Sequence, residues 1–322
     1  MVMCRGCVVS GLALDFCWSG VSFRQNQERV TVFKKLCASL LCVSAIHAVN
    51  DLVDLVCFSF DRGLQIDAHL ESVKRRVKGL NDSHVLYRAS ETKYDIPYQD
   101  LQKRFSTVHW VKQGANPAKD FKPLLLSILN NSKADYVLFS VDDIIVTEDV
   151  DLSVCVDALK NSGAYAFYLR LGKNITYCYV ENKRTPVPPL KSLGNDVWQW
   201  HIADCKGDWG YPNSVDLTIF RKDQVLRSIS DLDFSNPNYF ESCWSHRVSR
   251  DWCGLCFGMS KMINIPINVV HPGFTNNRNM HLYSKEDLLK LYLGGWAFDV
   301  EKLYKISHNS AHFEVKPTLV KR

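Results

Sequence analysis

The residues best placed to do chemistry are two adjacent acids, Asp142 and Asp143, at the end of the apolar segment 135–141. That segment predicts a buried strand, and in open α/β sheets ligands bind beyond the carboxyl ends of the strands. Two neighbouring carboxylates repel each other unless a cation lies between them, and hard oxygen ligands favour Mg²⁺ or Mn²⁺, especially one shared with phosphates. The pattern therefore predicts a metal–diphosphate site, with the alternative that both acids cap a turn.

The elements that would position these acids follow an alternation of apolar and amphipathic segments from residue 51 onward, which is typical of an α/β domain. Strands are expected at residues 52–60, 84–88, 107–111, 135–141, 164–171, 217–220 and 263–270. Helices are expected at residues 64–78, 98–105, 122–131, 149–161, 238–248 and 284–293. Residues 172–215 contain a proline cluster and the aromatic residues Trp198, Trp200 and Trp209, and they predict long loops over a binding face.

Length and composition are those of an ordinary globular chain. Of its 322 residues, 46% are hydrophobic and 23% are charged, which excludes disorder, collagen-like repetition and coiled coil. The net charge of +5 is spread along the chain and does not suggest a nucleic-acid partner. The 12 cysteines lie largely in apolar runs, which indicates buried thiols in a reducing, cytoplasmic setting. The pairs Cys4/Cys7 and Cys253/Cys256 have zinc-ligand spacing, but we interpret them as structural or incidental because they lie far apart in the chain.

Residues 1–50 form an N-terminal extension without a strand–helix rhythm. Within it, Lys34 and Lys35 precede the apolar run 36–48, which resembles a signal peptide but starts far from the beginning of the chain and is too short to span a bilayer. Three interpretations stay open: a short interfacial or export segment, an ordinary buried helix, or a start codon assigned too far upstream. We expect a cytoplasmic protein, with peripheral membrane association if this run is interfacial.

A specific order of motifs covers about residues 51–275. A strand is followed by D-R-G and a helix, then by a V-L-Y-R strand, a D-F-K helix, Y-V-L-F-S-V-D-D, W-G-Y-P-N-S-V-D, F-E-S and V-V-H. This order resembles the GT-A-fold glycosyltransferases. The resemblance implies that residues 51–322 form one α/β domain, GT-A-like and Rossmann-related, with a mostly parallel central sheet flanked by helices.

The resemblance also implies a metal-dependent, inverting glycosyltransferase that moves a sugar from a nucleotide-sugar donor to an acceptor hydroxyl of a glycan, a lipid or a protein. The donor diphosphate would be held by Mn²⁺ or Mg²⁺ on a D-x-D-type motif, represented here by Val141, Asp142 and Asp143. Of the two acids, Asp143 matches the family's metal-binding acid better. His271, directly after the expected strand, resembles the late histidine that completes the metal or diphosphate site.

Glu241 resembles the acid at the beginning of a helix that acts as general base in inverting members of this family. A carboxylate near the acceptor hydroxyl can take its proton as the glycosidic bond forms. The alternative is an acid in the first turn of a helix, stabilised there by the helix dipole.

By the same analogy the nucleotide would bind at the ends of the first two strands. Phe60, Asp61, Arg62 and Arg88 lie there, and such residues stack on a base or accept hydrogen bonds from ribose hydroxyls. Lys122 would approach the phosphates. The alternative for Arg88 is an ion pair without a ligand.

The sugar and the acceptor would lie beside Asp216 and the Trp209-Gly-Tyr-Pro segment, because aromatic faces suit the C–H surfaces of sugars, with plain core packing as the alternative. Two other functions stay open. A sugar nucleotidyltransferase shares the fold class but typically carries a glycine-rich phosphate loop, whereas Asp61-Arg62-Gly63 has one glycine. A non-catalytic sugar- or protein-binding module would retain the fold without the chemistry.

Overall fold

The computed structural model describes residues 50–322 except residues 248–250, 272, 274–277 and 305. The described residues gather into one unit that begins at Asn50. The rest of the predicted extension, together with Cys4 and Cys7, lies outside the described residues. Within the described part, no helix combines the length and the apolar character needed to cross a membrane.

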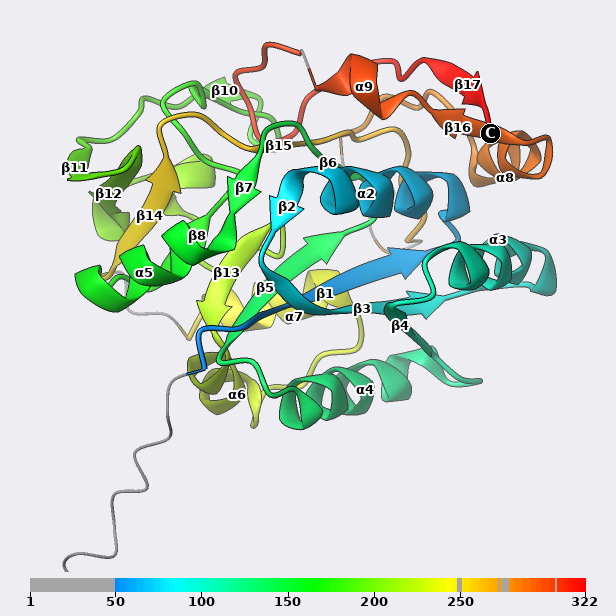
Figure 1. Cartoon of the computed structure of the whole chain (residues 1–322), viewed down its shortest axis with the longest axis horizontal. Helices are drawn as coiled ribbons and strands as arrows, with labels where there is room; N and C mark the ends of the chain where they lie inside the picture. Colours follow the sequence, from blue (N-terminus) through cyan, green and yellow to red (C-terminus); the bar gives the residue numbers. More distant parts are fainter. Residues whose placement is uncertain (1–49, 248–250, 272, 274–277, 305) are drawn as a thin grey trace, which may run out of the picture. The chain divides into compact units, whose positions relative to one another are not determined.

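Strand β1 (Val53–Phe60) lies beside the acids singled out above. Its side chains are buried on both faces of the sheet, as expected for a near-continuous apolar run in a parallel strand. It pairs in parallel with β3 (Leu80–Arg88) and with β5 (Tyr136–Val141). The carboxyl ends of these three strands therefore open on the same edge of the sheet, where Asp142 and Asp143 directly follow β5 (Figure 1).

The central sheet has nine strands in the order β11-β12-β14-β8-β13-β5-β1-β3-β4. Following the pairings from strand to strand, seven of these nine strands point the same way, and β12 and β13 run opposite. The prediction of an α/β fold with a mostly parallel central sheet is confirmed. The remaining strands of this sheet are β4 (Val108–Lys112), β8 (Ala166–Tyr168), β11 (Lys191–Gly194), β12 (Val197–His201), β13 (Thr218–Arg221) and β14 (Cys253–Phe257).

Helices cover both faces of this sheet (Figure 1). Side chains alternate along β1, so Cys57 packs with α2, α3 and α8 on one face, whereas Val56 and Phe58 pack with α4, α6 and α7 on the other. The helices are α2 (Gly63–Arg76), α3 (Thr92–Arg104), α4 (Pro117–Asn131), α5 (Leu152–Ser162), α6 (Lys222–Ile229), α7 (Pro237–Ser245), α8 (Lys285–Leu293) and α9 (Val300–Leu303). The absence of a side chain at Gly63 lets α2 lie against Pro97 of α3, where an added Cβ would come within 2.3 Å of the proline ring.

Short two-stranded sheets complete the architecture, and one of them shapes the site. The pairing of β6 with β15 brings the segment after β15 beside the two acids, and the N–H of Ile265 donates to the backbone oxygen of Asp143 at 2.9 Å. These short elements are β2 (Val77–Lys78) with β7 (Val150–Asp151), β6 (Ile144–Val146) with β15 (Met262–Asn264), β9 (Tyr177–Cys178) with β10 (Lys183–Arg184), β16 (Trp296–Phe298) with β17 (Leu319–Lys321), and the 3₁₀ turns η1 (Ile202–Asp204) and η2 (Gly207–Gly210).

Several element boundaries differ from those expected. The strand expected at 263–270 is only β15, because Pro266 has no N–H with which to continue a ladder. Helix α4 begins five residues earlier than expected, where Asn116 caps the N–H of Lys119 and Pro117 occupies the first turn. Helix α3 likewise begins at Thr92 rather than at residue 98.

Trp200 and Trp209 of segment 172–215 belong to the core rather than to a binding face, whereas other residues of the segment, among them Glu181, Tyr211 and Ser214, line the cavity described below. Strands β11 and β12 of this segment join the central sheet. Trp200 and Trp209 are buried, and their ring centroids lie 5.0 Å apart in an edge-to-face arrangement. The indole N–H of Trp209 donates to the backbone oxygen of Ile175 at 3.0 Å, so this side chain does not face a ligand.

Cys253 and Cys256 lie on strand β14, three residues apart. Successive side chains of a strand point to opposite faces, so an odd separation places the two thiols on opposite sides of the sheet. Cys256 packs in the core with α4 and α7, whereas Cys253 packs on the other face. The interpretation of this pair as structural rather than zinc-binding agrees with this geometry.

Candidate active site

A cavity of about 780 Å³ lies at the carboxyl ends of β1, β3 and β5. This volume is in the range of small-molecule and cofactor sites. Eight of the residues that the sequence predicts for the site line it, namely Phe60, Arg62, Arg88, Asp142, Asp143, Asp216, Glu241 and His271. The fold therefore gathers into one cavity residues that lie up to about 200 positions apart in the sequence, at the sheet edge where ligands of such folds bind.

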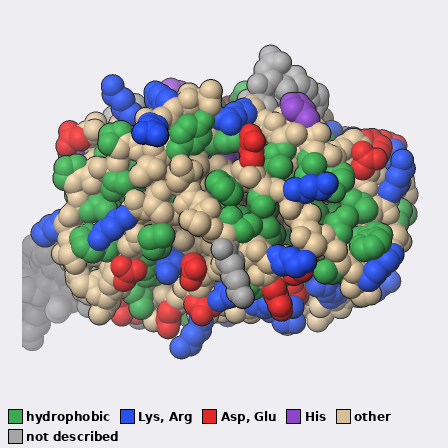
Figure 2. All heavy atoms as spheres, turned by 90° about the horizontal axis from the view of Figure 1, so that it is seen from above, with side chains coloured by type: hydrophobic (Ala, Val, Ile, Leu, Met, Phe, Trp, Pro, Cys, Tyr) green, Lys and Arg blue, Asp and Glu red, His purple; other side chains and the backbone are tan. Residues whose placement is uncertain are grey.

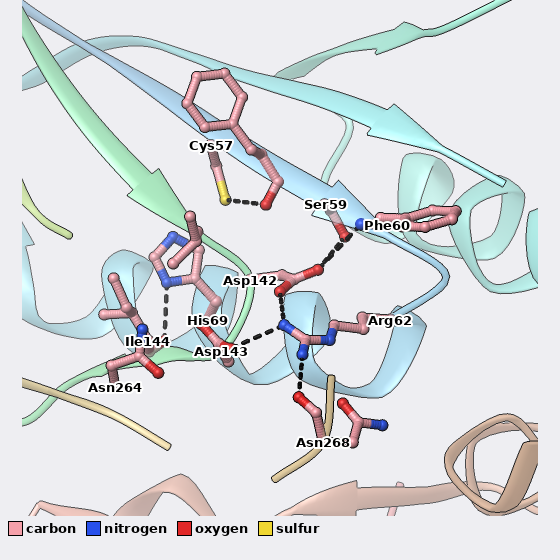
Figure 3. A network of polar contacts seen from close by, with 12 residues as sticks. Cys57, Ser59, Phe60, Arg62, His69, Asp142, Asp143, Ile144, Asn264 and Asn268 are labelled. Atoms are coloured by element: carbon pink, nitrogen blue, oxygen red, sulfur yellow. Dashed lines mark hydrogen bonds and ion pairs between the residues drawn. The ribbon is translucent and has the colours of Figure 1, made fainter. Parts of the chain in front are cut away.

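Arg62 lies between the two acids (Figure 3). Its Nη1 donates to Oδ1 of Asp142 at 2.9 Å and to Oδ2 of Asp143 at 2.8 Å, and its Nη2 donates to the backbone oxygen of Asn268 at 2.5 Å. Burial alone would lower the pKa of Arg62, but the two carboxylates outweigh it and raise this pKa above its ordinary value. The guanidinium is therefore a permanent positive charge at the position where the sequence predicts a metal ion.

Asp142 is held on its other side by β1. Its Oδ2 accepts hydrogen bonds from the hydroxyl of Ser59 at 2.8 Å and from the N–H of Phe60 at 3.2 Å. Tyr98 of α3 contacts Ser59 through its hydroxyl at 2.7 Å and accepts from the N–H of Arg62 at 3.2 Å. Burial raises the pKa of Asp142 to about 6, with Arg62 acting in the opposite direction. These contacts fix the carboxylate in one orientation.

Two predicted nucleotide-binding residues, Asp61 and Lys122, are not among the residues that line the cavity. The carboxylate of Asp61 accepts from the N–H of Ser90 at 2.7 Å and pairs with Lys285 at 3.0 Å. The ammonium of Lys122 donates to the backbone oxygens of Ser230 and Leu232. Both side chains therefore have structural partners, and their roles toward a nucleotide stay predictions.

Phe60 and Arg88 form one wall of the cavity. The Arg88 guanidinium lies 4.5 Å from the centroid of the Phe60 ring, a cation–π arrangement that joins the ends of β1 and β3. Arg88 acts on His271 as well, because burial and the positive charge of Arg88 together lower the pKa of His271. This wall offers a flat aromatic and guanidinium surface on which a base could stack.

Glu241 is the fifth of the nine residues of α7, which corrects the expectation of an acid at the beginning of the helix. It is partly buried and lines another part of the cavity. Its Oε1 accepts from the N–H of Val215 at 2.6 Å. Burial and then the negative charge of Asp216 raise the pKa of Glu241 to about 8. A carboxyl group with a pKa near neutrality is suited to take up and release a proton.

Asp216 itself contacts residues that the sequence did not single out. Its Oδ2 lies 3.5 Å from Nε2 of His312, and its Oδ1 accepts from the amide of Asn264 at 3.4 Å. Residues 311–313 run beside β15, and the His312 ring stacks on that of Tyr179 with 6.1 Å between the centroids. A lone histidine in an irregular C-terminal segment gave no sequence signal for this position.

Arg170 is a second residue that sequence reasoning missed. Its guanidinium is buried and donates to Oδ1 of Asp208 at 2.7 Å and to the backbone oxygens of Asp208 and Tyr211. Arg170 and Asp208 both line the cavity. Because the ion pair is buried and multiply bonded, it fixes the η2 region next to Glu241 and Asp216 rather than offering a free charge.

The predicted metal ion does not fit between Asp142 and Asp143 as these residues are arranged. A divalent cation takes several oxygen ligands, but the Arg62 guanidinium already bridges both carboxylates, and Ser59 and Phe60 bond the other oxygen of Asp142. Among the described residues, no three His, Cys, Asp or Glu side chains are grouped so that they could hold a metal ion. The roles of Asp142, Asp143 and His271 as metal ligands stay predictions.

One curated protein resembles this chain in sequence. The "Bifunctional glycosyltransferase pgtA" of Dictyostelium discoideum is 26% identical to it over 297 aligned residues, and the match covers 81% of this chain and 38% of that protein. The chain thus spans well under half the length of this relative. No family model matches the chain. The resemblance to glycosyltransferases that the motif order predicts is confirmed by this relative.

Solved structures resemble the chain only weakly. S. aureus TarS in complex with UDP matches with a TM-score of 0.43 and 12% identity, over 64% of this chain and 58% of that one. The mannosyltransferase PcManGT of Pyrobaculum calidifontis, in complex with GDP-Man and Mn²⁺, matches with a TM-score of 0.35 and 10% identity, over 67% of this chain and 59% of that one. A 4-diphosphocytidyl-2C-methyl-D-erythritol synthase matches with a TM-score of 0.36 and 11% identity, over 70% of this chain and 96% of that one. At these TM-scores none of the three structures decides between a transferase and a nucleotidyltransferase.

Proposed function

We propose that this chain transfers a sugar from a nucleotide-sugar donor to an acceptor hydroxyl, with inversion at the sugar carbon. The observation that carries the proposal is one cavity that contains both an arginine-bridged acid pair at the sheet edge and a carboxyl group of near-neutral pKa, Glu241. The arginine of the acid pair can donate hydrogen bonds to the diphosphate of a donor, and Glu241 can take the proton of an acceptor. The sequence similarity to a curated glycosyltransferase supports the same reaction class.

In this reaction Glu241 would accept the proton of the acceptor hydroxyl while the oxygen forms a bond to the sugar carbon. The bond from that carbon to the donor phosphate breaks at the same time, and its electron pair leaves with the nucleotide diphosphate. Removing a proton in the transition state in this way typically contributes 10²–10⁴ to the rate. Attack and departure on opposite sides of one carbon produce inversion.

The nucleotide of the donor would stack at the Phe60 and Arg88 wall, because this wall is flat, partly cationic and next to the acid pair. The acceptor would enter beside Glu241 and Asp216, and a glycan, lipid or protein hydroxyl can supply the attacking oxygen. On the face that Figure 2 presents, Lys and Arg side chains are interspersed with Asp and Glu side chains. A cytoplasmic location and peripheral membrane association stay predictions.

The involvement of Mn²⁺ or Mg²⁺ also stays a prediction. Asp142, Asp143 and His271 line the cavity and would be its ligands, but the Arg62 guanidinium competes for both carboxylates. No step above depends on a cation.

The test is turnover of activated sugars by the purified chain. A panel of UDP-, GDP- and CMP-sugars is incubated with mixed glycan, lipid and peptide acceptors, with Mn²⁺ and separately with EDTA, and release of free nucleotide is measured. We expect at least one donor to turn over and NMR of the product to show the inverted anomer. The Glu241→Gln variant should lose a factor of about 10²–10⁴ in kcat with little change in the dissociation constant of the donor nucleotide.

A matched control is Glu301→Gln, because Glu301 is exposed on α9, forms an ion pair with Arg75 and does not line the cavity. This variant should retain the parent rate. A retained anomer, or a Glu241→Gln variant as active as Glu301→Gln, would contradict the assigned base. Release of pyrophosphate from a nucleoside triphosphate and a sugar phosphate would favour the nucleotidyltransferase alternative. Donor binding without any turnover would favour a binding module.

A further inference from the structure

The Arg62 guanidinium is bonded to both acids and to the backbone of Asn268 (Figure 3). The guanidinium has five N–H donors. Two point to Asp142 and Asp143, and one points to the backbone oxygen of Asn268. The Asp142 and Asp143 carboxylates carry a formal charge of −2, so Arg62 reduces the charge of this cluster to −1. The cluster therefore already contains a positive charge at the place of a metal ion, one charge where a divalent cation would bring two.

Next to this guanidinium are polar atoms without partners in the described structure. Nε of Arg62 is buried and has no hydrogen-bond partner. Asn268 lines the same cavity and is only 8% exposed. Its side-chain Oδ1 and Nδ2 are also buried without hydrogen-bond partners. A buried amide with no bonds is costly, so an Asn268 side chain in this state indicates that a polar ligand completes it.

We propose that Arg62 is the resident cation of the donor site, and that with Asn268 it binds the diphosphate so that sugar transfer needs no divalent metal. The inference rests on the proposed function. When the bond from the sugar carbon to the phosphate oxygen breaks, that oxygen keeps the electron pair, and the N–H groups of Arg62 and Asn268 that are not engaged donate to the diphosphate. The acceptor proton goes to Glu241, so no other reactant is required.

Arginine suits this role because it stays charged at all physiological pH values and holds its donors in a rigid plane that matches phosphate oxygens. The contacts to Asp142, Asp143 and Asn268 place this plane without help from a ligand. Because the Arg62 side chain is only 11% exposed, its charge acts at a lower dielectric constant than in water. Arg88, which lines the same cavity, adds a second fixed positive charge on the nucleotide side.

The first experiment measures Mn²⁺ binding to the full chain by electron paramagnetic resonance and calorimetry, without nucleotide. The parent chain should show no Mn²⁺ site tighter than millimolar, because Arg62 occupies the two carboxylates. Arg62→Met removes the charge at similar volume and leaves Asp142 and Asp143 unpaired, so it should bind Mn²⁺ at least about tenfold more tightly than the parent. Adding Asp143→Asn to Arg62→Met should abolish that gain.

The matched control is Arg104→Met. Arg104 bridges Asp67 and Glu71 in a similar way but does not line the cavity. A gain in Mn²⁺ affinity confined to Arg62→Met would assign the effect to the cavity acids. Equal Mn²⁺ affinity in the parent and in Arg62→Met would overturn the proposal, and this measurement is valid whether or not a donor is known. If Arg62→Met does not fold, a tight Mn²⁺ site in the parent alone overturns the proposal.

The second experiment uses the donor that turns over in the panel. After dialysis against EDTA, the parent should keep its rate within about threefold of the rate with added Mn²⁺ or Mg²⁺, a change of about 0.65 kcal/mol on the transition-state scale. Loss of turnover in EDTA with full recovery on adding Mn²⁺ would refute the resident-cation role while leaving the proposed transferase intact. Absence of turnover with every donor, with or without metal, would instead refute the proposed function, and the Mn²⁺ titration would still decide the role of Arg62.

Discussion

The pH dependence of turnover tests the pairing of Glu241 with Asp216. Burial and the Asp216 charge raise the pKa of Glu241 to about 8. A general base acts only in its ionised form, so kcat/KM should rise as the pH rises through this pKa and level off above it. At pH 7 about one tenth of Glu241 would be ionised, which predicts about a tenfold increase in kcat/KM between pH 7 and pH 9.

The informative perturbation is Asp216→Asn, which removes a negative charge next to Glu241 at nearly constant volume. Without a like charge beside it, the Glu241 carboxylate is easier to form, so its pKa falls and the rise of kcat/KM moves to lower pH. We expect a displacement of at least about one pH unit, which corresponds to about 1.4 kcal/mol between the two protonation states. Other charged groups near this pair are Arg170, held by Asp208, then His312, which contacts Asp216, and Asp143, whose negative charge also acts on Asp216.

The assay is kcat/KM for the donor that turns over, from pH 5.5 to 9.5 in buffers of constant ionic strength. Asp223→Asn is the matched control, because Asp223 lies at the surface of α6 in an ion pair with Arg227, and its profile should coincide with that of the parent. A parent profile that is flat or falls between pH 6 and 9 would refute Glu241 as base. An inflection that stays in place in Asp216→Asn would show that the two carboxyl groups are not coupled.

Two further predictions concern structural partners. Lys122→Met should change nucleotide affinity by less than about twofold in a calorimetric titration. The reason is that the Lys122 ammonium bonds backbone oxygens of the loop after α6 and does not line the cavity. A tenfold loss of affinity would show that Lys122 binds the phosphates. Asp208→Ala should lower the free energy of unfolding in urea by about 3–5 kcal/mol, since it leaves the Arg170 charge buried without its partner; a loss below about 1 kcal/mol would mean that water reaches this guanidinium.

How much of this site the sequence predicts depends on how local the signal is. The buried strand β5 and the two acids after it were predictable, because the apolar run and the acids Asp142 and Asp143 that end it are contiguous in the sequence. The capping box of α8, in which Ser284 and Asp287 exchange hydrogen bonds, is local in the same way, and the structure contains it. The α/β class followed from the alternation of such local patterns.

Contacts between distant residues could not be predicted in this way. Arg62 was expected to face a nucleotide, but it meets carboxylates 80 and 81 positions later in the chain and a carbonyl 206 positions later. Lys285 reaches Asp61 across 224 positions, which explains why Asp61 lies outside the cavity lining although its neighbour Arg62 is part of it. No periodicity or spacing records such pairings, because each depends on how the sheet edge and the C-terminal segments pack together.

The distribution of charge within the cavity gives the proposed reaction a direction. At the sheet edge, the positive charges of Arg62 and Arg88 balance the two carboxylates of Asp142 and Asp143, and the two guanidinium groups offer N–H donors to a group that gains negative charge. Beside α7, burial and then the charge of Asp216 keep the pKa of Glu241 high, so that part favours a group that loses a proton. In a glycosyl transfer the diphosphate gains negative charge as it leaves and the acceptor hydroxyl loses its proton as it attacks. The two ends of one cavity therefore match the two charge changes of one displacement.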